Sequence, residues 1–193
     1  MNKAERTRRF IIEKSSSIIN KKGMAGTSLS DIMEATKLAK GGIYGNFDSK
    51  DEICVASFHY LTETLAHQLD RAVLNGKTAS EKFFNLLNAY KSNKDTEGGC
   101  PILNFGVEAD DTHPLMKENV KIAIRSSQKR IFNIIADGIA NNELSPEMNP
   151  KNFSIKVFAM IEGAILCRRV LESDEQMRII IEVIREEFES HLI

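Results

Sequence analysis

A short segment near the N-terminus carries side chains whose chemistry suits binding to a nucleic acid. The Lys40 ammonium can pair with a phosphate, the Tyr44 hydroxyl can donate a hydrogen bond to one, and the Asn46 amide can bond to a base edge. Gly41 and Gly42 add no side chain, and each costs about 1 kcal/mol relative to Ala inside a helix. A helix that keeps both glycines is expected to approach another surface closely. The chemistry predicted here is noncovalent recognition of DNA.

Two short helices are needed to position these groups, and the first is predicted to begin near Leu29. Ser28 and Asp31 stand three positions apart and form a capping box, in which each side chain satisfies a backbone N–H that the first helical turn leaves unpaired. Leu29, Ile32 and Met33 follow at the i, i+3, i+4 spacing that gathers them on one face. We expect this face to dock on a core.

The second helix is predicted to start at Ala39 or Lys40, after a turn of three or four residues. Ile43 and Phe47 lie four positions apart and can pack inward, while Lys40 and Tyr44 point elsewhere. Two short helices joined by such a turn form a helix-turn-helix. An ordinary αα-hairpin that happens to contain two glycines explains this sequence pattern equally well. Other observations have to separate the helix-turn-helix from such a hairpin.

The distribution of charge favours the DNA-binding interpretation. Residues 1–50 hold ten Lys or Arg and five Asp or Glu, a net charge of +5, whereas the rest of the chain carries −6 and the whole chain only −1. A surface selected for solubility alone would mix the two signs. Basic charge confined to the segment that holds the two short helices is expected of a nucleic-acid-binding module.

The run from Thr27 to Lys50 resembles the signature of the TetR family, which consists of bacterial one-component transcriptional repressors. Three positions depart from the family pattern: Lys37 stands where the turn usually has Gly, Ala39 where the second helix usually has a Ser or Thr cap, and Gly45-Asn46 where a His or Tyr pair usually precedes Phe47. The residues that carry the resemblance are Thr27, Asp31, Ile32, Ala35, Leu38, Lys40, Gly41, Ile43, Tyr44, Phe47 and Lys50.

The resemblance implies which residues lie near DNA. Thr27, Tyr44 and Lys50 are expected beside phosphates together with Lys40, and the glycine pair is expected to face the major groove. With glycines where side chains usually contact bases, specificity is expected to depend on Asn46, on Lys37 and on DNA shape. The predicted DNA-binding residues are Thr27, Ser28, Lys37, Lys40, Gly41, Gly42, Tyr44, Asn46 and Lys50.

The remaining sequence predicts an all-α protein with two domains. Hydrophobic residues make up 42% of the 193 residues, enough for a sizeable core, and strand signals are absent. We expect a helix-turn-helix DNA-binding domain at 1–50 and a helical effector-binding and dimerisation domain at 51–193. Helices are predicted over 6–22, closed by Gly23, and over 50–75, 80–93, 101–109, 114–141, 150–171 and 174–191.

The cysteines and the N-terminus predict a reduced, cytoplasmic protein. The three cysteines are odd in number and scattered, with no CxxC pair. The charged N-terminus is followed by an apolar run too short for a signal peptide, and no run approaches the 18 or more apolar residues of a membrane span. We therefore expect no membrane association.

No residue pattern predicts a catalytic or metal site. Glu108, Asp110, Asp111 and His113 form one acidic cluster that could hold a divalent cation, but they precede Pro114, where such residues commonly cap helices and form turns. We interpret the cluster as a solvated loop. Ser-His-Asp, GxxxxGK and HExxH patterns are absent, so neither enzyme activity nor a cofactor or metal is expected. A helical enzyme using this loop and an interaction protein without affinity for DNA are the competing hypotheses.

The two C-terminal helices carry more apolar residues than one face can hold, so they are buried on several sides. They either form the core of a monomer or pair with a second copy in a four-helix interface, and the resemblance favours the homodimer. A two-fold dimer also matches palindromic half-sites one helical turn apart. The predicted interface residues are Phe158, Ile161, Gly163, Ile165, Ile180, Ile184 and Phe188.

By analogy with the family, the middle helices are expected to enclose a pocket for a small apolar or aromatic effector that releases the repressor from its operator. The sequence does not identify this molecule. Cys100 precedes Pro101 at a predicted helix start, where a thiolate is favoured, so a redox or electrophile sensor acting through Cys100 is the alternative. The predicted pocket residues are Phe58, Leu61, Leu65, Phe84, Leu87, Cys100, Phe105 and Phe132.

Overall fold

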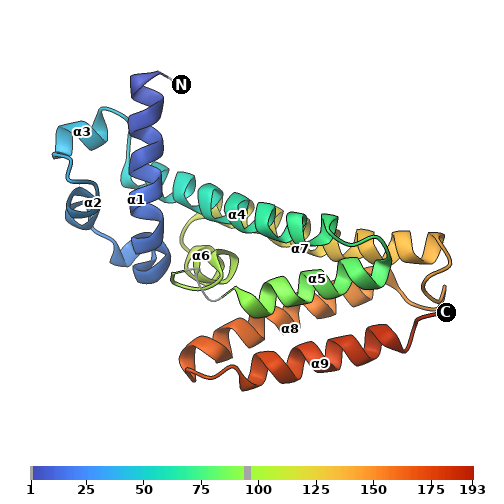
Figure 1. Ribbon diagram of the computed structural model, residues 1–193. Helices are drawn as coiled ribbons and strands as arrows, with labels where there is room; N and C mark the ends of the chain where they lie inside the picture. The colour runs from blue at the N-terminus through green and yellow to red at the C-terminus, as the bar shows by residue number, and fades with distance from the viewer. Residues whose placement is uncertain (1, 94–96) are drawn as a thin grey trace. The chain divides into compact units, whose positions relative to one another are not determined.

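The computed structural model describes residues 2–93 and 97–193, and within these ranges it consists of α-helices with one isolated bridge between Leu144 and Leu192. The predicted all-α class is confirmed. Among the described helices, none is long and apolar enough to cross a membrane. The helices in Figure 1 are α1 (Lys3–Gly26), α2 (Leu29–Thr36), α3 (Lys40–Tyr44), α4 (Lys50–Leu74), α5 (Ala79–Ser92), α6 (Pro101–Ala109), α7 (Pro114–Ala140), α8 (Pro150–Val170) and α9 (Glu175–Glu189).

The chain forms two compact units. Unit 1 comprises Met1–Thr64 and Asp95–Lys121, and unit 2 comprises Leu65–Lys94 and Ile122–Ile193; positions 1 and 94–96 lie outside the described ranges. Helices α4 and α7 each contribute residues to both units. The predicted domain boundary at residue 50 differs from this division and stays a prediction.

Helices α2 and α3 begin where the sequence predicts, whereas α1 begins at Lys3, three residues before the predicted start, because Asn2 caps it. Ser28 caps α2 in a reciprocal capping box with Asp31, as predicted. Helix α3, the second helix of the predicted helix-turn-helix, starts at Lys40, after Ala39. In α1, Gly23 adopts φ +80° and ψ 168°, so the regular helix is interrupted at the residue predicted to close it.

Helix α6 belongs to unit 1, and two asparagine amides join this helix and the residues before it to α1. The Asn104 side chain donates hydrogen bonds to the Asn20 carbonyl at 3.1 Å and to the Gly98 carbonyl at 2.7 Å. Asn20 in turn donates to the carbonyls of Glu97, at 2.6 Å, and Gly99, at 3.0 Å. Asn20 is almost completely buried, so these bonds satisfy polar groups that water does not reach.

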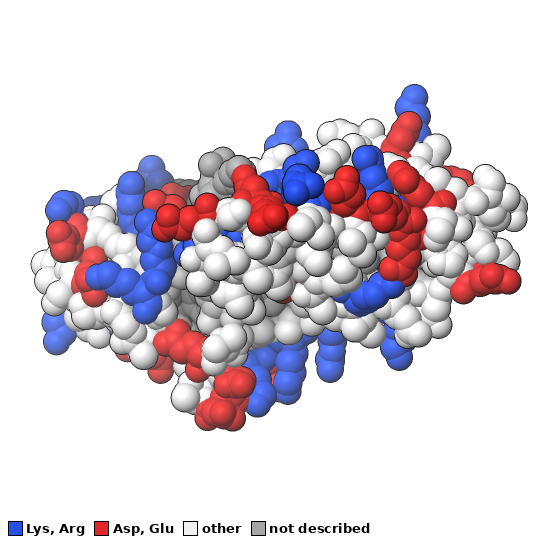
Figure 2. Space-filling view, turned by 90° about the horizontal axis from the view of Figure 1, so that it is seen from below, with Lys and Arg blue, Asp and Glu red and all other residues white. Residues whose placement is uncertain are grey.

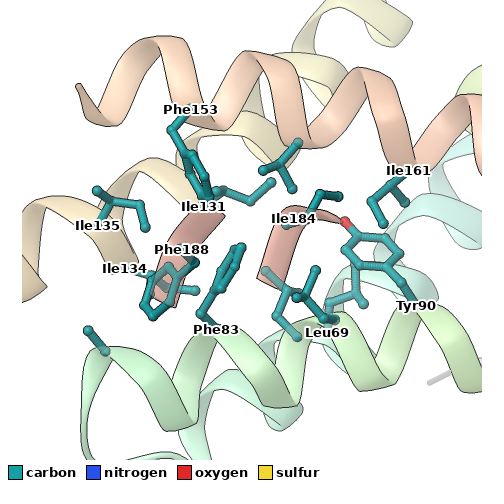
Figure 3. Close-up of a cluster of buried hydrophobic side chains, with 14 of the residues drawn as sticks. Leu69, Phe83, Tyr90, Ile131, Ile134, Ile135, Phe153, Ile161, Ile184 and Phe188 are labelled. Carbon is teal, nitrogen blue, oxygen red and sulfur yellow. The ribbon is translucent and has the colours of Figure 1, made fainter. Parts of the chain in front are cut away.

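Phenylalanine rings from three helices form the centre of the unit 2 core (Figure 3). The Phe83 ring on α5 stacks on Phe188 of α9, with centroids 4.5 Å apart, and lies 5.5 Å from the ring of Phe153 on α8. Phe84 meets the edge of Phe188 at 5.4 Å. Aromatic pairs at these separations add to the stability gained from burial.

The predicted interface residues differ in their burial within the chain, and the interface itself stays a prediction. Ile161, Ile184 and Phe188 are almost completely buried in the core of unit 2. Phe158, Ile165 and Ile180 are partly buried against the same core, and Gly163 is exposed. Periodicity identified these helices as apolar on several sides, but it did not identify which side faces inward.

Replacing Phe83 with Ala should strongly destabilise unit 2. The change removes a fully buried ring with three aromatic neighbours and leaves a cavity, so the free energy of unfolding should fall by about 3–5 kcal/mol. Urea unfolding at a fixed protein concentration measures this. The matched control is Phe132→Ala on α7, where the ring is 39% exposed and the loss should be clearly smaller. Equal losses would contradict the assignment of Phe83 to the centre of the core.

Candidate DNA-binding site

The turn between α2 and α3 presents a lysine in an unusual backbone conformation. Lys37 ends α2 with φ +57° and ψ 24°, the left-handed conformation that favours glycine at a helix C-terminus. This explains why the family pattern has Gly at the position. The Lys37 side chain is exposed, so this departure places an additional positive charge at the turn.

Two exposed lysines, Lys37 and Lys40, give the surface on and beside α3 its positive charge. Lys40 and Tyr44 are both exposed, and the Lys40 ammonium lies 5.8 Å from the centre of the Tyr44 ring. Within the described chain, no ion pair is recorded for Lys37 or Lys40. By contrast, Lys22 pairs with Asp31 at 2.6 Å, so part of the positive charge of this segment is compensated. The uncompensated charge therefore includes the lysines on and beside α3.

The two glycines of α3 are not required by the packing of this chain. A Cβ built at Gly41 would meet no other atom within 4 Å, and one at Gly42 would meet only Leu38, at an ordinary contact distance of 3.6 Å. Both residues are exposed and lie within a helix of negative φ. The conformational cost of glycine in a helix is therefore unexplained by anything within the protein.

The inward face of α3 is anchored by apolar residues, as predicted. Ile43 and Phe47 are almost completely buried. The Arg8 guanidinium of α1 lies 4.0 Å from the centre of the Phe47 ring and donates a hydrogen bond to the Asn46 carbonyl. Arg8 also pairs with Glu52 at 2.6 Å. This arginine thus joins α1 to the end of α3 and the start of α4.

Glu52 is held ionised at this junction. The Asp48 backbone N–H donates to its carboxylate at 2.7 Å, and this bond, followed by the bond from Arg8, lowers the pKa of Glu52. Since the folded-state pKa is lowered, the stability contributed by the carboxylate is present above its ordinary pKa and is lost as the pH falls through the folded value. The junction is therefore intact at neutral pH.

Two residues expected beside phosphates, Thr27 and Lys50, make hydrogen bonds within the chain. Thr27 is fully buried, and its hydroxyl donates to the Gly23 carbonyl at 2.7 Å. The Lys50 ammonium donates to the carbonyls of Met24, at 2.8 Å, and Thr27, at 3.0 Å. In this conformation Thr27 offers no surface to a phosphate, and Lys50 is occupied in holding the α1–α2 connection. Sequence spacing could not distinguish such contacts from contacts with DNA.

Ser28, at the start of α2, and Asn46, just after α3, also make hydrogen bonds within the chain. The Ser28 hydroxyl donates to the Asp31 carboxylate at 2.7 Å but remains exposed. Lys22 first, and then Ser28, lower the pKa of Asp31 well below its ordinary value. The Asn46 amide donates to the Gly42 carbonyl at 2.8 Å. Contacts of Ser28 and Asn46 with DNA stay predictions.

An acid that sequence analysis placed in a solvated cluster proves to be structural. The Glu108 carboxylate, on α6, accepts hydrogen bonds from the backbone N–H groups of Met24 at 2.6 Å and Ala25 at 2.5 Å. A Cβ built at Gly23 would lie only 2.9 Å from the same carboxylate. Among the described residues, no group of three or more His, Cys, Asp or Glu could hold a metal ion. Only the three-dimensional contact identifies the role of Glu108.

The predicted effector residues divide between the two units. Phe58 and Phe105 pack in unit 1 with ring centroids 5.2 Å apart, and Cys100 is buried in the same unit, with 6% of its surface exposed. Cys54, also in unit 1, is fully buried, and burial raises the pKa of its thiol to about 11. In unit 2, the Arg185 guanidinium covers the Phe84 ring at 4.2 Å. The remaining predicted members are Leu61 in unit 1 and Leu65, Leu87 and Phe132 in unit 2.

The fold and this surface define a helix-turn-helix DNA-binding protein. Comparison with protein families gives the same result: a profile described as "Bacterial regulatory proteins, tetR family" matches residues 11–56, and one described as "Tetracyclin repressor-like, C-terminal domain" matches residues 76–184. The chain belongs to the TetR family of DNA-binding transcriptional regulators, as the resemblance predicted.

Individual relatives agree over nearly the whole chain. A TetR-family transcriptional regulator from Cytophaga hutchinsonii is 34% identical, with a TM-score of 0.95, and the match covers 100% of this chain and 98% of that chain. A TetR transcriptional regulator from Chloroflexus aurantiacus is 31% identical, with a TM-score of 0.94 and the same coverage. The HTH-type transcriptional regulator TtgR of Pseudomonas putida is 26% identical over 171 residues, which cover 84% of this chain and 80% of TtgR.

Replacing Gly41 with Ala should separate stability from DNA binding. The new methyl group meets nothing in the protein and favours the helix, so the free energy of unfolding should stay unchanged or rise by up to about 1 kcal/mol. The dissociation constant for a duplex selected from random sequences should rise by about tenfold, because the methyl group enters the space left for DNA. Thermal unfolding and fluorescence anisotropy measure the two effects.

The control is Asn88→Ala, at an exposed position on α5. It should also favour its helix but should leave DNA affinity unchanged. Wild-type affinity in Gly41→Ala would show that DNA does not closely approach this surface.

Proposed function

We propose that the chain is a homodimeric repressor that places α3 in the major groove of a palindromic operator and leaves the operator when a small apolar or aromatic effector binds. The observation that carries the DNA-binding part is the exposed surface at Lys37, Lys40 and Tyr44, beside glycines for which the protein itself has no need. The ammonium and phenol groups would hold phosphates and so fix the position of the helix. Gly41 and Gly42 would let the helix backbone approach the bases.

An unpartnered apolar face on α8 and α9 supports the homodimer. Ile155, Leu166 and Val170 are exposed on α8 at positions that share one face with Ala159 and Gly163. In Figure 2, seen from the side on which α8 and α9 lie in Figure 1, uncharged residues form a strip bordered by charged side chains. A Cβ at Gly163 would meet nothing within 4 Å, which leaves room for a helix of a second copy. Exposed Ile179 and Val183 extend the apolar surface onto α9.

The effector part of the proposal rests on the family. The C-terminal profile is described as tetracyclin repressor-like, and it covers residues 76–184. The predicted pocket residues are apolar or aromatic, which favours an effector of the same character. A redox sensor acting through Cys100 is less well supported because the residue is buried.

DNA binding should depend on salt and on two side chains of α3. Lys40→Ala and Tyr44→Phe should each weaken binding to the selected duplex, and Lys40→Ala should also reduce the slope of log affinity against log salt by about 1, because one phosphate contact is lost. Fluorescence anisotropy over a range of salt concentrations measures both quantities. The control Lys91→Ala, exposed on α5, should change neither. If the wild-type chain does not bind DNA duplexes at low salt, the proposed function is wrong.

A charge placed on the apolar face should separate the protomers. Leu166→Glu would bury a carboxylate in the proposed interface, so the variant should sediment as a monomer and bind the palindromic duplex at least about tenfold more weakly. Val107→Glu introduces the same charge at an exposed position on α6, where the side chain is 73% exposed, and is the control that should remain dimeric. An unchanged sedimentation coefficient in Leu166→Glu would exclude this face as the interface.

A further inference from the structure

Unit 2 contains an open cleft that none of the predicted sites includes. Its volume is about 620 Å³, within the range of small-molecule sites. The walls come from the last turns of α4, the start of α5 and one face of α7. The lining residues are Asp70, Val73, Leu74, Gly76, Lys82, Ser126, Lys129, Arg130, Asn133, Ile134 and Asp137.

One wall of the cleft is apolar and adjoins the core. Ile134 is 3% exposed and belongs to the core cluster of unit 2, where Figure 3 labels it. Val73 packs against the same cluster, and Leu74 beside it is 80% exposed. A leucine so open to water next to a concave surface offers apolar area that a ligand can cover.

Positive charge in the cleft exceeds what its own acids neutralise. Arg130 pairs with Asp70 through its Nε atom at 2.6 Å, and among the described residues no other hydrogen bond or ion pair is recorded for this guanidinium. Its side chain is only 10% exposed, so the remaining N–H groups are poorly hydrated. Within the described chain no ion pair is recorded for Lys82 or Lys129. The lining acids are Asp70, which pairs with Arg130, and Asp137, so the three basic side chains outnumber the two acids.

The charges are separated along the cleft. Lys129 and Asp137 are eight residues apart on α7, which corresponds to about 12 Å along the helix axis. Lys82 lies near Gly76, because a Cβ built there would be 2.5 Å from the Lys82 backbone nitrogen. Arg130 is adjacent to Lys129 in sequence, and both line the cleft. One end of the cleft thus combines an ammonium with a partly engaged guanidinium, and the distant acid does not neutralise it.

We infer that this cleft binds a small organic anion with an apolar body. The anionic group, a carboxylate or sulfonate, pairs with Lys129 and with the remaining N–H groups of Arg130. The apolar body covers Leu74 and Val73 and rests against Ile134. Binding requires no covalent step, and it is independent of whether the chain represses transcription.

Two probes that differ in charge test the class of ligand. Naphthalene-1-carboxylate and naphthalene-1-carboxamide have the same ring system, and calorimetric titration measures their dissociation constants with the full chain. The carboxylate should bind about tenfold more tightly than the amide, as a charge-assisted pair requires. Equal affinities, or no binding of the carboxylate, would overturn the inference.

Variants then locate the site. Lys129→Ala should weaken binding of the carboxylate by about tenfold and leave binding of the amide unchanged, whereas Leu74→Ser should weaken binding of both probes. Leu74 is largely exposed and Lys129 lies at the surface, so both variants should fold; their melting temperatures verify this. Lys151→Ala on α8 removes the same charge outside the cleft and is the control. If Lys151→Ala weakens binding of the carboxylate as much as Lys129→Ala does, binding does not occur in the cleft.

The same proteins separate this inference from the proposed function. DNA affinity is measured on the wild type, on Lys129→Ala and on Leu74→Ser without a probe present. If these variants lose affinity for the probe but still bind DNA, the loss of probe binding is a property of the cleft. If the wild type binds the carboxylate but no DNA, the repressor proposal fails and the cleft remains.

Discussion

The arrangement of the DNA-binding helices depends on how the backbone is satisfied at the break in α1. Gly23 interrupts the helix, so the N–H groups and carbonyls that follow lose their regular helical partners. Glu108 accepts from the N–H groups of Met24 and Ala25, while Lys50 donates to the carbonyls of Met24 and Thr27. Residues from α4 and α6 therefore fix the point at which the chain enters α2. Any rearrangement of these two helices within unit 1 acts directly on this connection.

Local sequence signals were sufficient for the start of α2, the break in α1 and the inward face of α3, whereas α1 begins at Lys3 and not at the predicted residue 6. The Ser28–Asp31 capping box, the helix break at Gly23 and the inward face of Ile43 and Phe47 depend on residues at most four positions apart, and all are found as predicted. Glu108 could not be found in this way, because its partners Met24 and Ala25 are more than 80 residues distant. The same limit applied to α8 and α9, because the period of an apolar helix does not specify which of its faces the core of the same chain covers.

Charge in the N-terminal segment has two different uses. Arg8 and Lys50 stabilise the junctions of the helices through ion pairs and backbone carbonyls, whereas Lys37 and Lys40 remain exposed without recorded acid partners in the part of the chain that the structure describes. The net charge of +5 over residues 1–50 counts both groups equally. Only the second group is free to lower the free energy of binding to a polyanion. The net charge of the segment therefore overstates the charge that is free to pair with phosphates.

The unequal burial of the three cysteines has a practical consequence for spectroscopy. Cys54 and Cys100 are buried, while Cys167 on α8 is partly open to solvent. A maleimide dye offered to the native chain should attach first at α8, because the thiolate of Cys54 is also suppressed by its raised pKa. The natural sequence thus supplies a preferred labelling position for fluorescence measurements, without prior removal of the other thiols.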